Sequence, residues 1–382
     1  MKVLIVARGY PTEKYKMNGI FEFDQAKALV ESGVDVVYAA IDVRSIRRWR
    51  KWGIETKTVE GVKIYALNLP LGRIPKPILR FISKIGLKCL YKRIIKEQGK
   101  PDIMHAHFSS IGYIATIIKK KYNIPFVLTE HLSTLMSASI KNDVYKTAQR
   151  AYSIADKIIT VSPELKNVIE EKFHKNAIHI PNIVDTNLFS YPGESRKNTF
   201  SFVSIGSLIY RKRMDLTIKS FIDAFCNNEK VSLTIFGEGP ERQKLEELIN
   251  VNNMGGRIEL MGMQSRKVIS DCLKKSDCFV LASQAETFGV VYIEAMASGL
   301  PVIATKCGGP ESFINEKNGI LIPLNQKDSL IRSMKDIYKN AHKFDRKAIS
   351  MNTIKDFSPE AISRKLYDAY EDVITFKEER EL

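Results

Sequence analysis

Short apolar runs alternate along this chain with longer segments in which apolar residues recur every three or four positions. The short runs are typical of buried strands, and the longer pattern is typical of amphipathic helices. Their alternation predicts parallel sheets whose strands are joined by crossover helices. In the first half we expect strands at 3–7, 34–40, 62–67, 102–107, 125–131, 157–162 and 177–182, with helices at 20–32, 77–98, 109–121 and 141–155.

A polar, turn-rich stretch at 191–198 interrupts this rhythm, which then restarts. A chain of 382 residues is also too long for one ordinary core. We therefore predict two doubly wound, Rossmann-like α/β domains at 1–192 and 199–357, with a ligand in the cleft between them at the carboxyl ends of the strands. The second half predicts strands at 199–206, 231–237, 257–262, 278–283, 301–305 and 319–323, and a closing helix at 358–382 that Ser358-Pro-Glu opens.

The strongest chemical signal follows the predicted strand at 278–283. Glu286 lies in a short loop, and a helix is expected to start near Phe288 and to carry Glu294 in an early turn. Gly289 permits close approach to a ligand, and free N–H groups at a helix N-terminus suit an anion such as a diphosphate. The Glu294 carboxylate could accept hydrogen bonds from the diol of a ribose, and Glu286 could hold the hydroxyls of a second sugar-sized group. Taken singly, each glutamate could equally be a surface acid or an acid at a helix N-terminus.

A basic loop follows the predicted strand at 199–206. The strand ends at Gly206, and Arg211-Lys212-Arg213 precedes the next helix. Ammonium and guanidinium groups on such a loop can neutralise a leaving diphosphate. A basic turn of this composition can also simply be solvated, so the loop alone does not decide between the two interpretations.

Together these blocks resemble the retaining group 1 (family 4) glycosyltransferases, whose members carry an E-x7-E block. The match from Cys278 to Glu311 is nearly continuous. The segment 206–212 resembles the family's G-R-L-x-x-x-K-G motif, with Ser207 where the family usually has Arg. The resemblance implies the GT-B fold, with the closing helix crossing back onto the first domain. It also implies transfer of a hexose-type sugar from a nucleotide-sugar, with retention of the anomeric configuration.

The resemblance assigns roles to individual residues. It implies that Glu286 contacts the donor hexose, that Glu294 contacts the ribose, and that Lys212 contacts the phosphates. Backbone near the start of the helix would contact the diphosphate, and Arg211 or Arg213 could compensate for the missing Arg. The predicted catalytic residues are Lys212, Glu286 and His131, and the predicted donor-binding residues are Gly19, Gly206, Arg211, Phe288, Gly289 and Glu294.

Two features of the first half agree with this interpretation. Gly19 precedes an amphipathic helix, at a place where similar family members keep a glycine whose backbone faces the donor phosphates. A role in helix capping is the alternative. His131 follows a strongly apolar strand and resembles the family's cleft histidine, which touches the donor sugar. His105 and His107 also end a strand, and we expect at most one of them to face the cleft.

The sequence contains no D-x-D triplet, a pattern that metal-dependent transferases often carry. We therefore expect no metal and no cofactor beyond a UDP- or GDP-linked sugar as substrate. The five cysteines are scattered, which favours reduced thiols and a cytoplasmic protein. No uncharged apolar stretch reaches the length of about 18 residues that a membrane-spanning helix needs.

Positive charge is concentrated between residues 41 and 100, which hold 16 Lys and Arg against 4 Asp and Glu. The stretch 44–52 interleaves cations with two tryptophans, and 73–96 predicts a helix with Arg80, Lys84, Lys88 and Lys92 four apart. Such segments favour an anionic membrane surface, so we expect a peripheral enzyme on the inner face of the cell membrane. A solvated helix packed on the sheet is the alternative, and no recognition motif points to nucleic acid.

The predicted function is glycosyl transfer to a saccharide acceptor, expected to be lipid-linked, in cell-surface polysaccharide or glycolipid biosynthesis. Two alternatives stay open. A scaffold protein of a polysaccharide assembly complex, weakened by Ser207, would bind nucleotide without turnover. A GT-B sugar-nucleotide epimerase would release a changed sugar without using an acceptor.

Overall fold

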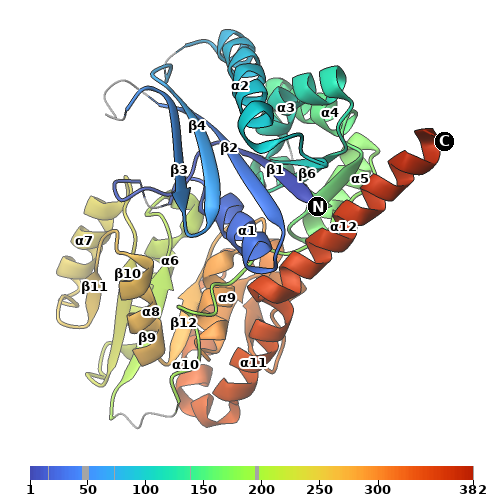
Figure 1. Ribbon diagram of the computed structural model, residues 1–382. Helices are drawn as coiled ribbons and strands as arrows, with labels where there is room; N and C mark the ends of the chain where they lie inside the picture. Colours follow the sequence, from blue (N-terminus) through green and yellow to red (C-terminus); the bar gives the residue numbers. More distant parts are fainter. Residues whose placement is uncertain (16, 45–50, 73, 138, 194–197, 382) are drawn as a thin grey trace. The chain divides into compact units, whose positions relative to one another are not determined.

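The computed structural model describes residues 1–15, 17–44, 51–72, 74–137, 139–193 and 198–381, apart from the side chains of 380 and 381. The chain divides into two compact units, Met1–Ile183 with Pro359–Leu382, and Val184–Ser358. Each unit contains its own sheet with helices around it (Figure 1). The predicted pair of Rossmann-like α/β units is therefore confirmed.

The first unit is built on an eight-stranded sheet with the order β3-β4-β2-β1-β5-β6-β7-β8. Neighbouring strands are parallel, except that β3 pairs with β4 in the antiparallel sense. The strand β3 was not predicted, because it alternates exposed and half-exposed residues at the edge of the sheet. The strands are β1 (Lys2–Ala7), β2 (Asp35–Val43), β3 (Gly53–Val59), β4 (Val62–Leu69), β5 (Ile103–His107), β6 (Phe126–Glu130), β7 (Lys157–Thr160) and β8 (Ile178–His179).

Helices cover the first sheet, and the last helix of the chain belongs to them. The helix α12 (Pro359–Glu381) contacts α1 (Ile20–Glu31) and β6, and α12 runs beside α1 in Figure 1. Its buried Ile362, Leu366 and Tyr370 join one core cluster with apolar residues of α1 and of the sheet. The other helices are α2 (Lys76–Gln98), α3 (Ser109–Tyr122), α4 (Asn142–Tyr152), α5 (Pro163–Phe173) and the short η1 (Ser133–Met136).

The second unit is built on a six-stranded parallel sheet with the order β11-β10-β9-β12-β13-β14. Read in chain order from β9, this is the 3-2-1-4-5-6 arrangement of dinucleotide-binding folds. The strands are β9 (Phe200–Ile205), β10 (Val231–Phe236), β11 (Ile258–Leu260), β12 (Cys278–Leu281), β13 (Val302–Thr305) and β14 (Gly319–Ile322). The helices are η2 (Tyr210–Lys212), α6 (Met214–Phe225), α7 (Arg242–Val251), α8 (Arg266–Lys275), α9 (Val290–Ala297), η3 (Gly309–Ser312), α10 (Lys327–Asn340), η4 (Ala341–Lys343) and α11 (Arg346–Phe357).

The second unit begins at Val184, so that 184–192 do not fall in the first domain to which the sequence assigned them. The Val184 N–H donates to the carbonyl of Phe357 at 2.9 Å, and the Ser270 hydroxyl donates to the carbonyl of Leu188 at 2.6 Å. The turn-rich composition marks an irregular stretch, but it does not say which core buries its apolar residues. Residues 194–197 of the predicted linker lie outside the described residues.

Candidate functional site

Side chains from two loops meet at the carboxyl edge of the second sheet. Strand β9 lies between β10 and β12, and the loops that follow β9 and β12 carry Lys212 and Glu286. The Lys212 ammonium forms an ion pair with Glu286 Oε1, and both side chains are largely buried. Doubly wound sheets bind their ligands where the strand order reverses, which is this point. The structure thus brings together two residues that separate motifs had predicted.

Further contacts hold the Glu286 carboxylate in place. The Ser283 hydroxyl donates to the same Oε1 at 2.6 Å, and the Thr305 hydroxyl donates to the Ser283 carbonyl. The Glu286 N–H donates to the carbonyl of Cys307 at 3.1 Å, and its own carbonyl accepts from Gly309 at 2.9 Å. Ser283 was not predicted, although its place three residues before Glu286 in a loop was a signal that the sequence offered.

Glycines allow the loop after β9 to pack closely on the loop after β10. Gly237 has φ +143°, and a Cβ there would lie 1.9 Å from the carbonyl oxygen of Gly206. A Cβ on Gly239 would lie 2.3 Å from the carbonyl oxygen of Leu208, whose N–H donates to the Glu238 carbonyl at 2.9 Å. The predicted Gly206 therefore lies in a backbone contact that places the basic loop at the edge of the sheet.

The basic residues of this loop have different surroundings. Ser207, which stands where the family has Arg, is exposed. Arg213 is engaged within the unit, since its Nε lies 3.0 Å from Asp215 Oδ1 and its Nη1 donates to Asn325. Arg211 is partly buried, and its carbonyl accepts from Gln284, in the loop that also carries Glu286, at 2.8 Å. Of the two arginines expected to compensate for Ser207, Arg211 is therefore the better placed.

The helix α9 begins at Val290, two residues after the expected start, and Gly289 caps it with φ +91°. The Phe288 ring packs against Phe313, with 5.1 Å between ring centroids, so only its backbone can face a ligand. A Cβ on Gly309 would lie 2.3 Å from Phe288 Cα. The free N–H groups at the start of α9 thus belong to the same edge as Lys212, which is an arrangement suited to an anion.

Glu294 is buried in the second turn of α9 and has a partner that was not predicted. Arg266 Nη2 lies 3.2 Å from Glu294 Oε1. Arg266 begins α8, which Ser265 caps by accepting from the Val268 N–H. The two residues are 28 positions apart in sequence. The sequence around either residue therefore does not predict that they form an ion pair.

The first sheet has the same reversal of strand order, at β1 between β2 and β5. Arg8 follows β1, and its guanidinium lies 3.7 Å from the centroid of the Phe108 ring, which follows β5. Arg8 Nε also donates to Glu22 Oε1 at 3.1 Å. Phe108 has φ +66°, a conformation that costs a bulky residue about 1–3 kcal/mol and that clusters at functional sites. None of these three residues was predicted.

His131 lies in the same cluster. Its Nε2 is 3.1 Å from His107 Nδ1, and its ring centroid is 4.8 Å from that of Phe108. The buried carboxylate of Glu130 fixes the local backbone, because its Oε1 accepts from the N–H groups of His131 at 2.9 Å and Leu132 at 3.0 Å.

Burial keeps these imidazoles neutral. It lowers the pKa of His131 to about 3 and that of His105 to about 3, and it lowers the pKa of His107 well below its usual value. The rings of His105 and His107 share one face of β5, with centroids 4.3 Å apart, because alternate residues of a strand point to the same side. The expectation that at most one faces the cleft was therefore based on the wrong geometry. His105 bonds to Tyr370 and Thr129 through its two nitrogens, so its role is structural.

The predicted Gly19 caps α1 with φ +69°. A Cβ at this position would lie 2.3 Å from the carbonyl oxygen of Gly9, which follows Arg8. The close approach of the two backbones accounts for a glycine here, and it brings the N-terminus of α1 to the carboxyl edge of the first sheet.

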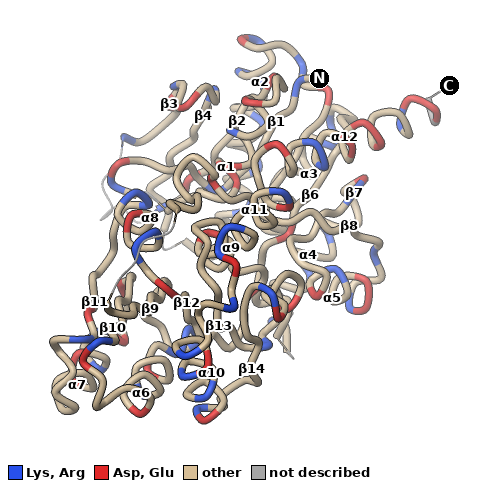
Figure 2. The backbone as a smooth tube through the Cα atoms, turned by 90° about the horizontal axis from the view of Figure 1, so that it is seen from below, with Lys and Arg blue, Asp and Glu red and all other residues tan. Residues whose placement is uncertain are grey.

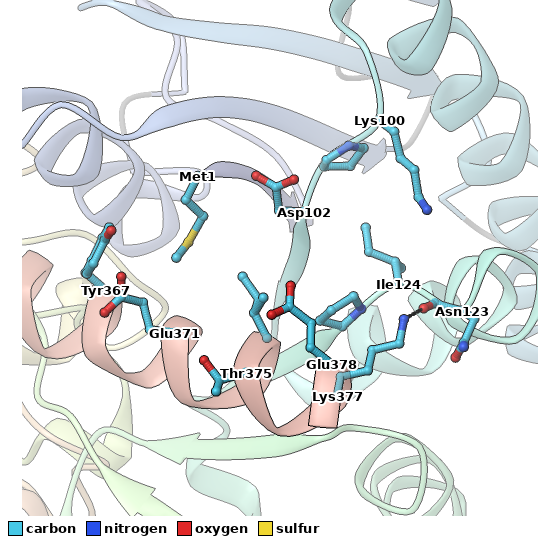
Figure 3. Close-up of a pocket in the computed structure, with 13 residues that line it drawn as sticks. Met1, Lys100, Asp102, Asn123, Ile124, Tyr367, Glu371, Thr375, Lys377 and Glu378 are labelled. Atoms are coloured by element: carbon cyan, nitrogen blue, oxygen red, sulfur yellow. Dashed lines mark hydrogen bonds between the residues drawn. The ribbon is translucent and has the colours of Figure 1, made fainter. Parts of the chain in front are cut away.

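The first unit also has a hollow of about 680 Å³ at the opposite edge of its sheet (Figure 3). Met1 and Asp102 line it just before β1 and β5, and Tyr367 and Glu371 line it from α12. Lys377 donates to the Asn123 carbonyl at its rim. These are the amino ends of the strands, whereas parallel α/β sheets bind ligands at the carboxyl ends. The hollow is therefore no part of the candidate site.

The basic helix α2 differs from the prediction in how its residues point. Of its predicted row of cations, Arg80 forms an ion pair with Asp143 of α4 at 2.6 Å, and the Lys84 ammonium lies 3.6 Å from the centroid of the Tyr113 ring in α3. These two cations therefore serve contacts within the unit. Residues 45–50 and 73 of the predicted membrane segments lie outside the described residues. Arg44 is buried against Asp42 and Tyr15 and does not reach the surface.

Apolar residues instead form the exposed face of α2. Ile78, Phe81 and Ile85 expose 52%, 65% and 47% of their surface, and their spacing of three and four places them on one side of the helix. The charged residues of α2 are all basic except Glu97, whereas both signs of charge occur on several other helices (Figure 2). The helix therefore combines an exposed apolar stripe with the cations Lys88 and Lys92.

Comparison with protein families matches both halves of the chain. The model described as "Glycosyl transferases group 1" matches residues 189–356, and the model described as "Glycosyltransferase Family 4" matches residues 23–188. The first match contains Lys212, Glu286 and Glu294, and the second contains His131.

Curated relatives point to the same activity. An uncharacterised glycosyltransferase of Methanocaldococcus jannaschii is 31% identical over 271 residues, which cover 70% of this chain and 73% of that protein. The putative teichuronic acid biosynthesis glycosyltransferase TuaC of Bacillus subtilis is 24% identical over 361 residues, covering 87% of this chain and 88% of that protein.

Solved structures share the fold. Sucrose-phosphate synthase of Thermosynechococcus elongatus has a TM-score of 0.82 at 18% identity, covering 98% of this chain and 99% of that chain. The Anabaena protein HepE, in complex with UDP-glucose, has a TM-score of 0.74 at 16% identity, covering 97% of this chain and 100% of that chain. The family matches, the relative in M. jannaschii and the paired acidic and basic side chains at the second sheet agree: this chain belongs to the group 1 (family 4) glycosyltransferases and has their GT-B architecture of two Rossmann-like units.

Proposed function

We propose that this glycosyltransferase moves a hexose-type sugar, with retention of its anomeric configuration, from a UDP- or GDP-linked donor to a lipid-linked saccharide acceptor. The product would belong to a cell-surface polysaccharide or glycolipid. The observation that carries the proposal is the meeting of Lys212 with Glu286 beside the N-terminus of α9, the helix that also carries Glu294. HepE bound to UDP-glucose and TuaC, named for teichuronic acid synthesis, support the donor type and the pathway type.

In the proposed reaction the bond between the sugar's C1 and the β-phosphate oxygen breaks, and the acceptor hydroxyl oxygen bonds to C1 on the same face. Lys212 and the N–H groups at the start of α9 stabilise the charge that develops on the departing diphosphate. That phosphate takes the acceptor's proton, so no protein base is required. We propose no metal in this step, because the ammonium and the helix N-terminus supply the positive charge.

The ion pair has a second role in this proposal. Without ligand, Glu286 balances the buried Lys212 ammonium. When the diphosphate binds, its negative charge pairs with the Lys212 ammonium in place of Glu286. Glu286 can then accept hydrogen bonds from the hexose hydroxyls. Glu294 would accept from the ribose hydroxyls, and His131 would contact the donor sugar as a neutral hydrogen-bonding group.

The first test is a calorimetric titration of UDP, GDP and ADP into the purified chain. Saturable binding of one of them, weakened by Glu294→Ala and unchanged by Glu316→Ala, is the expected result. Glu316 is the matched control because it is an exposed acid of the same unit. No binding of any of the three by a folded sample would refute the donor site.

The reaction product distinguishes a retaining transferase from an inverting transferase, an epimerase and an inactive scaffold. With the nucleotide-sugar that binds, NMR of the product should show the donor's anomeric configuration in a new glycosidic bond. An inverted linkage would refute retention. Release of a changed free sugar would favour the epimerase, and binding with no turnover in the presence of candidate acceptors would favour the scaffold.

We further propose that the protein acts on the inner face of the cell membrane and that α2 contacts the lipid. The exposed Ile78, Phe81 and Ile85 support this, since an apolar stripe flanked by Lys88 and Lys92 suits an anionic bilayer surface. None of the described helices combines the length and the apolar character that crossing a membrane requires.

Vesicle flotation tests the membrane contact. Vesicles of phosphatidylglycerol and phosphatidylethanolamine should bind the protein, and vesicles of phosphatidylcholine alone should bind it less. Phe81→Ser should reduce flotation several-fold, whereas Phe376→Ser, which changes an equally aromatic exposed residue on α12, should not. Equal loss in both variants, or no flotation of the unchanged protein, would refute the role of α2.

A further inference from the structure

We propose that Arg8 binds an anionic group of the acceptor, a carboxylate or a phosphate, at the carboxyl edge of the first sheet. This inference rests on the proposed transferase function, because it concerns which acceptors the enzyme accepts. It assigns a role to Arg8, which neither the sequence motifs nor the family matches mark, since Arg8 precedes the matched region 23–188.

Arg8 lies at the point of the first sheet where a ligand is expected. It follows β1, and its ring partner Phe108 follows β5, the two strands at which the order of the sheet reverses. The crevice outside the carboxyl ends of two such strands is the usual ligand site of an open α/β sheet. The second unit has its Lys212–Glu286 pair at the corresponding point.

The guanidinium of Arg8 is held on two sides and exposed on the rest. Its Cζ lies 3.7 Å from the centroid of the Phe108 ring, and its Nε lies 3.1 Å from Oε1 of the buried Glu22. The side chain nevertheless keeps 48% of its surface exposed. Among the described residues, its Nη1 and Nη2 groups have no hydrogen-bond partner, so one edge of the guanidinium faces outward with its donors unused.

That edge has the geometry of an anion receptor. Guanidinium is planar and always charged, and its paired donors match the two oxygens of a carboxylate or phosphate. Because Phe108 and Glu22 already fix the side chain, binding would cost little further rotamer entropy. The fixed φ of +66° at Phe108 is explained in this way, since it holds the ring beneath the cation.

The neighbours favour a sugar that bears the anion. His107 precedes Phe108, and burial lowers its pKa well below the usual value, so it adds a neutral hydrogen-bonding group without a competing charge. His131, which we assign to the donor sugar, is neutral for the same reason and lies beside it. His107 Nε2 is completely buried and has no partner in the described part of the chain. The cluster thus offers the free edge of the Arg8 guanidinium for an acidic group and a neutral imidazole nitrogen for a hydroxyl.

Arginine-selective NMR of the full chain tests the proposal. The protein is labelled with ¹⁵N-arginine, and the Nε–H signal of Arg8 is assigned by its absence from Arg8→Lys, or from Arg8→Gln if that variant does not fold. Glucuronate, glucose 1-phosphate and glucose are then titrated. We expect the Arg8 signal to shift saturably with at least one of the two anionic sugars and not with glucose. The anion that shifts it more identifies whether the acceptor group is a carboxylate or a phosphate.

Four outcomes would overturn the proposal. The Arg8 signal could stay in place with both anionic sugars, it could shift equally with glucose, or it could shift only together with the signal of Arg364, an exposed arginine of the same unit. A saturable shift caused by UDP at the concentration that occupies the nucleotide site would also overturn it, because Arg8 would then belong to the donor. The transferase proposal is tested separately, by the calorimetric titration of nucleotides into the unchanged protein, Glu294→Ala and the control Glu316→Ala.

Discussion

The two units share one architecture but carry different chemistry at the same place. In both, the strand order reverses at the first strand, and the side chains that differ lie around this point at the carboxyl edge of the sheet. The second unit places oppositely charged pairs there, Lys212 with Glu286 and Arg266 with Glu294. The first unit places neutral histidines and an aromatic ring there, with Arg8 the exposed cation. We therefore expect the sheet to fix where a ligand binds and the side chains at its carboxyl edge to decide what binds.

The comparison also separates two ways of stabilising charge. Ion pairs in the second unit keep charged groups ready in a buried place, which suits a ligand that itself carries two phosphates. The first unit removes charge from its buried imidazoles, and within the cluster of Arg8, Phe108 and these histidines Arg8 is the partly exposed cation.

The largest effect is expected from Lys212→Ala. Loss of the ammonium removes stabilisation of the departing diphosphate and leaves Glu286 without its partner, so kcat should fall by about 100–1,000-fold. Steady-state kinetics measure this, with Lys219→Ala as the control because Lys219 is an exposed lysine on the following helix. An unchanged kcat would show that the second unit does not hold the leaving group.

The histidines of the first unit should make its stability depend on pH. Burial lowers the pKa of His131 in the folded protein to about 3, so the unfolded chain binds the proton more readily, and stability should fall as pH drops below about 6.5. Between pH 7 and pH 5 this one group should cost about 2 kcal/mol. Denaturant unfolding of His131→Asn should therefore show a shallower loss of stability on acidification. Equal slopes for variant and wild type would contradict a neutral His131.

Ser283→Ala should have a smaller effect, confined to catalysis. The variant removes the hydrogen bond of 2.6 Å to Glu286, whose loss is worth about 1 kcal/mol, so kcat should fall about 5-fold while UDP affinity changes little. Ser220→Ala is the control, since Ser220 is equally buried and its hydroxyl has no partner among the described residues. A fall in affinity without a fall in kcat would show that Ser283 acts on the nucleotide site.

The smallest effect is expected from Ser207→Arg. Ser207 is exposed, so a longer side chain meets no steric barrier, and a second cation near Lys212 should tighten UDP binding a few-fold. Asn250→Arg adds the same charge at another exposed position of the unit and should change affinity little. If Ser207→Arg also leaves affinity unchanged, Arg211 already supplies the missing phosphate contact.

The sequence was most informative where the site is local. Glu286, Gly289 and Glu294 lie within nine residues of one another, so the strand, the loop and the helix that place them could be predicted together. The central strands of both units were predicted from continuous apolar runs, because they are buried on both faces, and the helices from their period of three to four, because one side packs on a sheet. The edge strand β3 was not predicted. About half of its residues are exposed to solvent, so its sequence lacks a clear apolar pattern.

By itself, then, the sequence determined two α/β units and the family motifs of the second, because burial imposes a pattern along the chain and glycines mark where backbone must approach closely. Only the tertiary structure decided that Arg8 lies over Phe108, a hundred positions away, and that Arg266 pairs with Glu294. It also decided that Arg80 turns to Asp143 while Phe81 faces solvent. Contacts between distant segments depend on how helices pack on the sheet, and no local period records that packing.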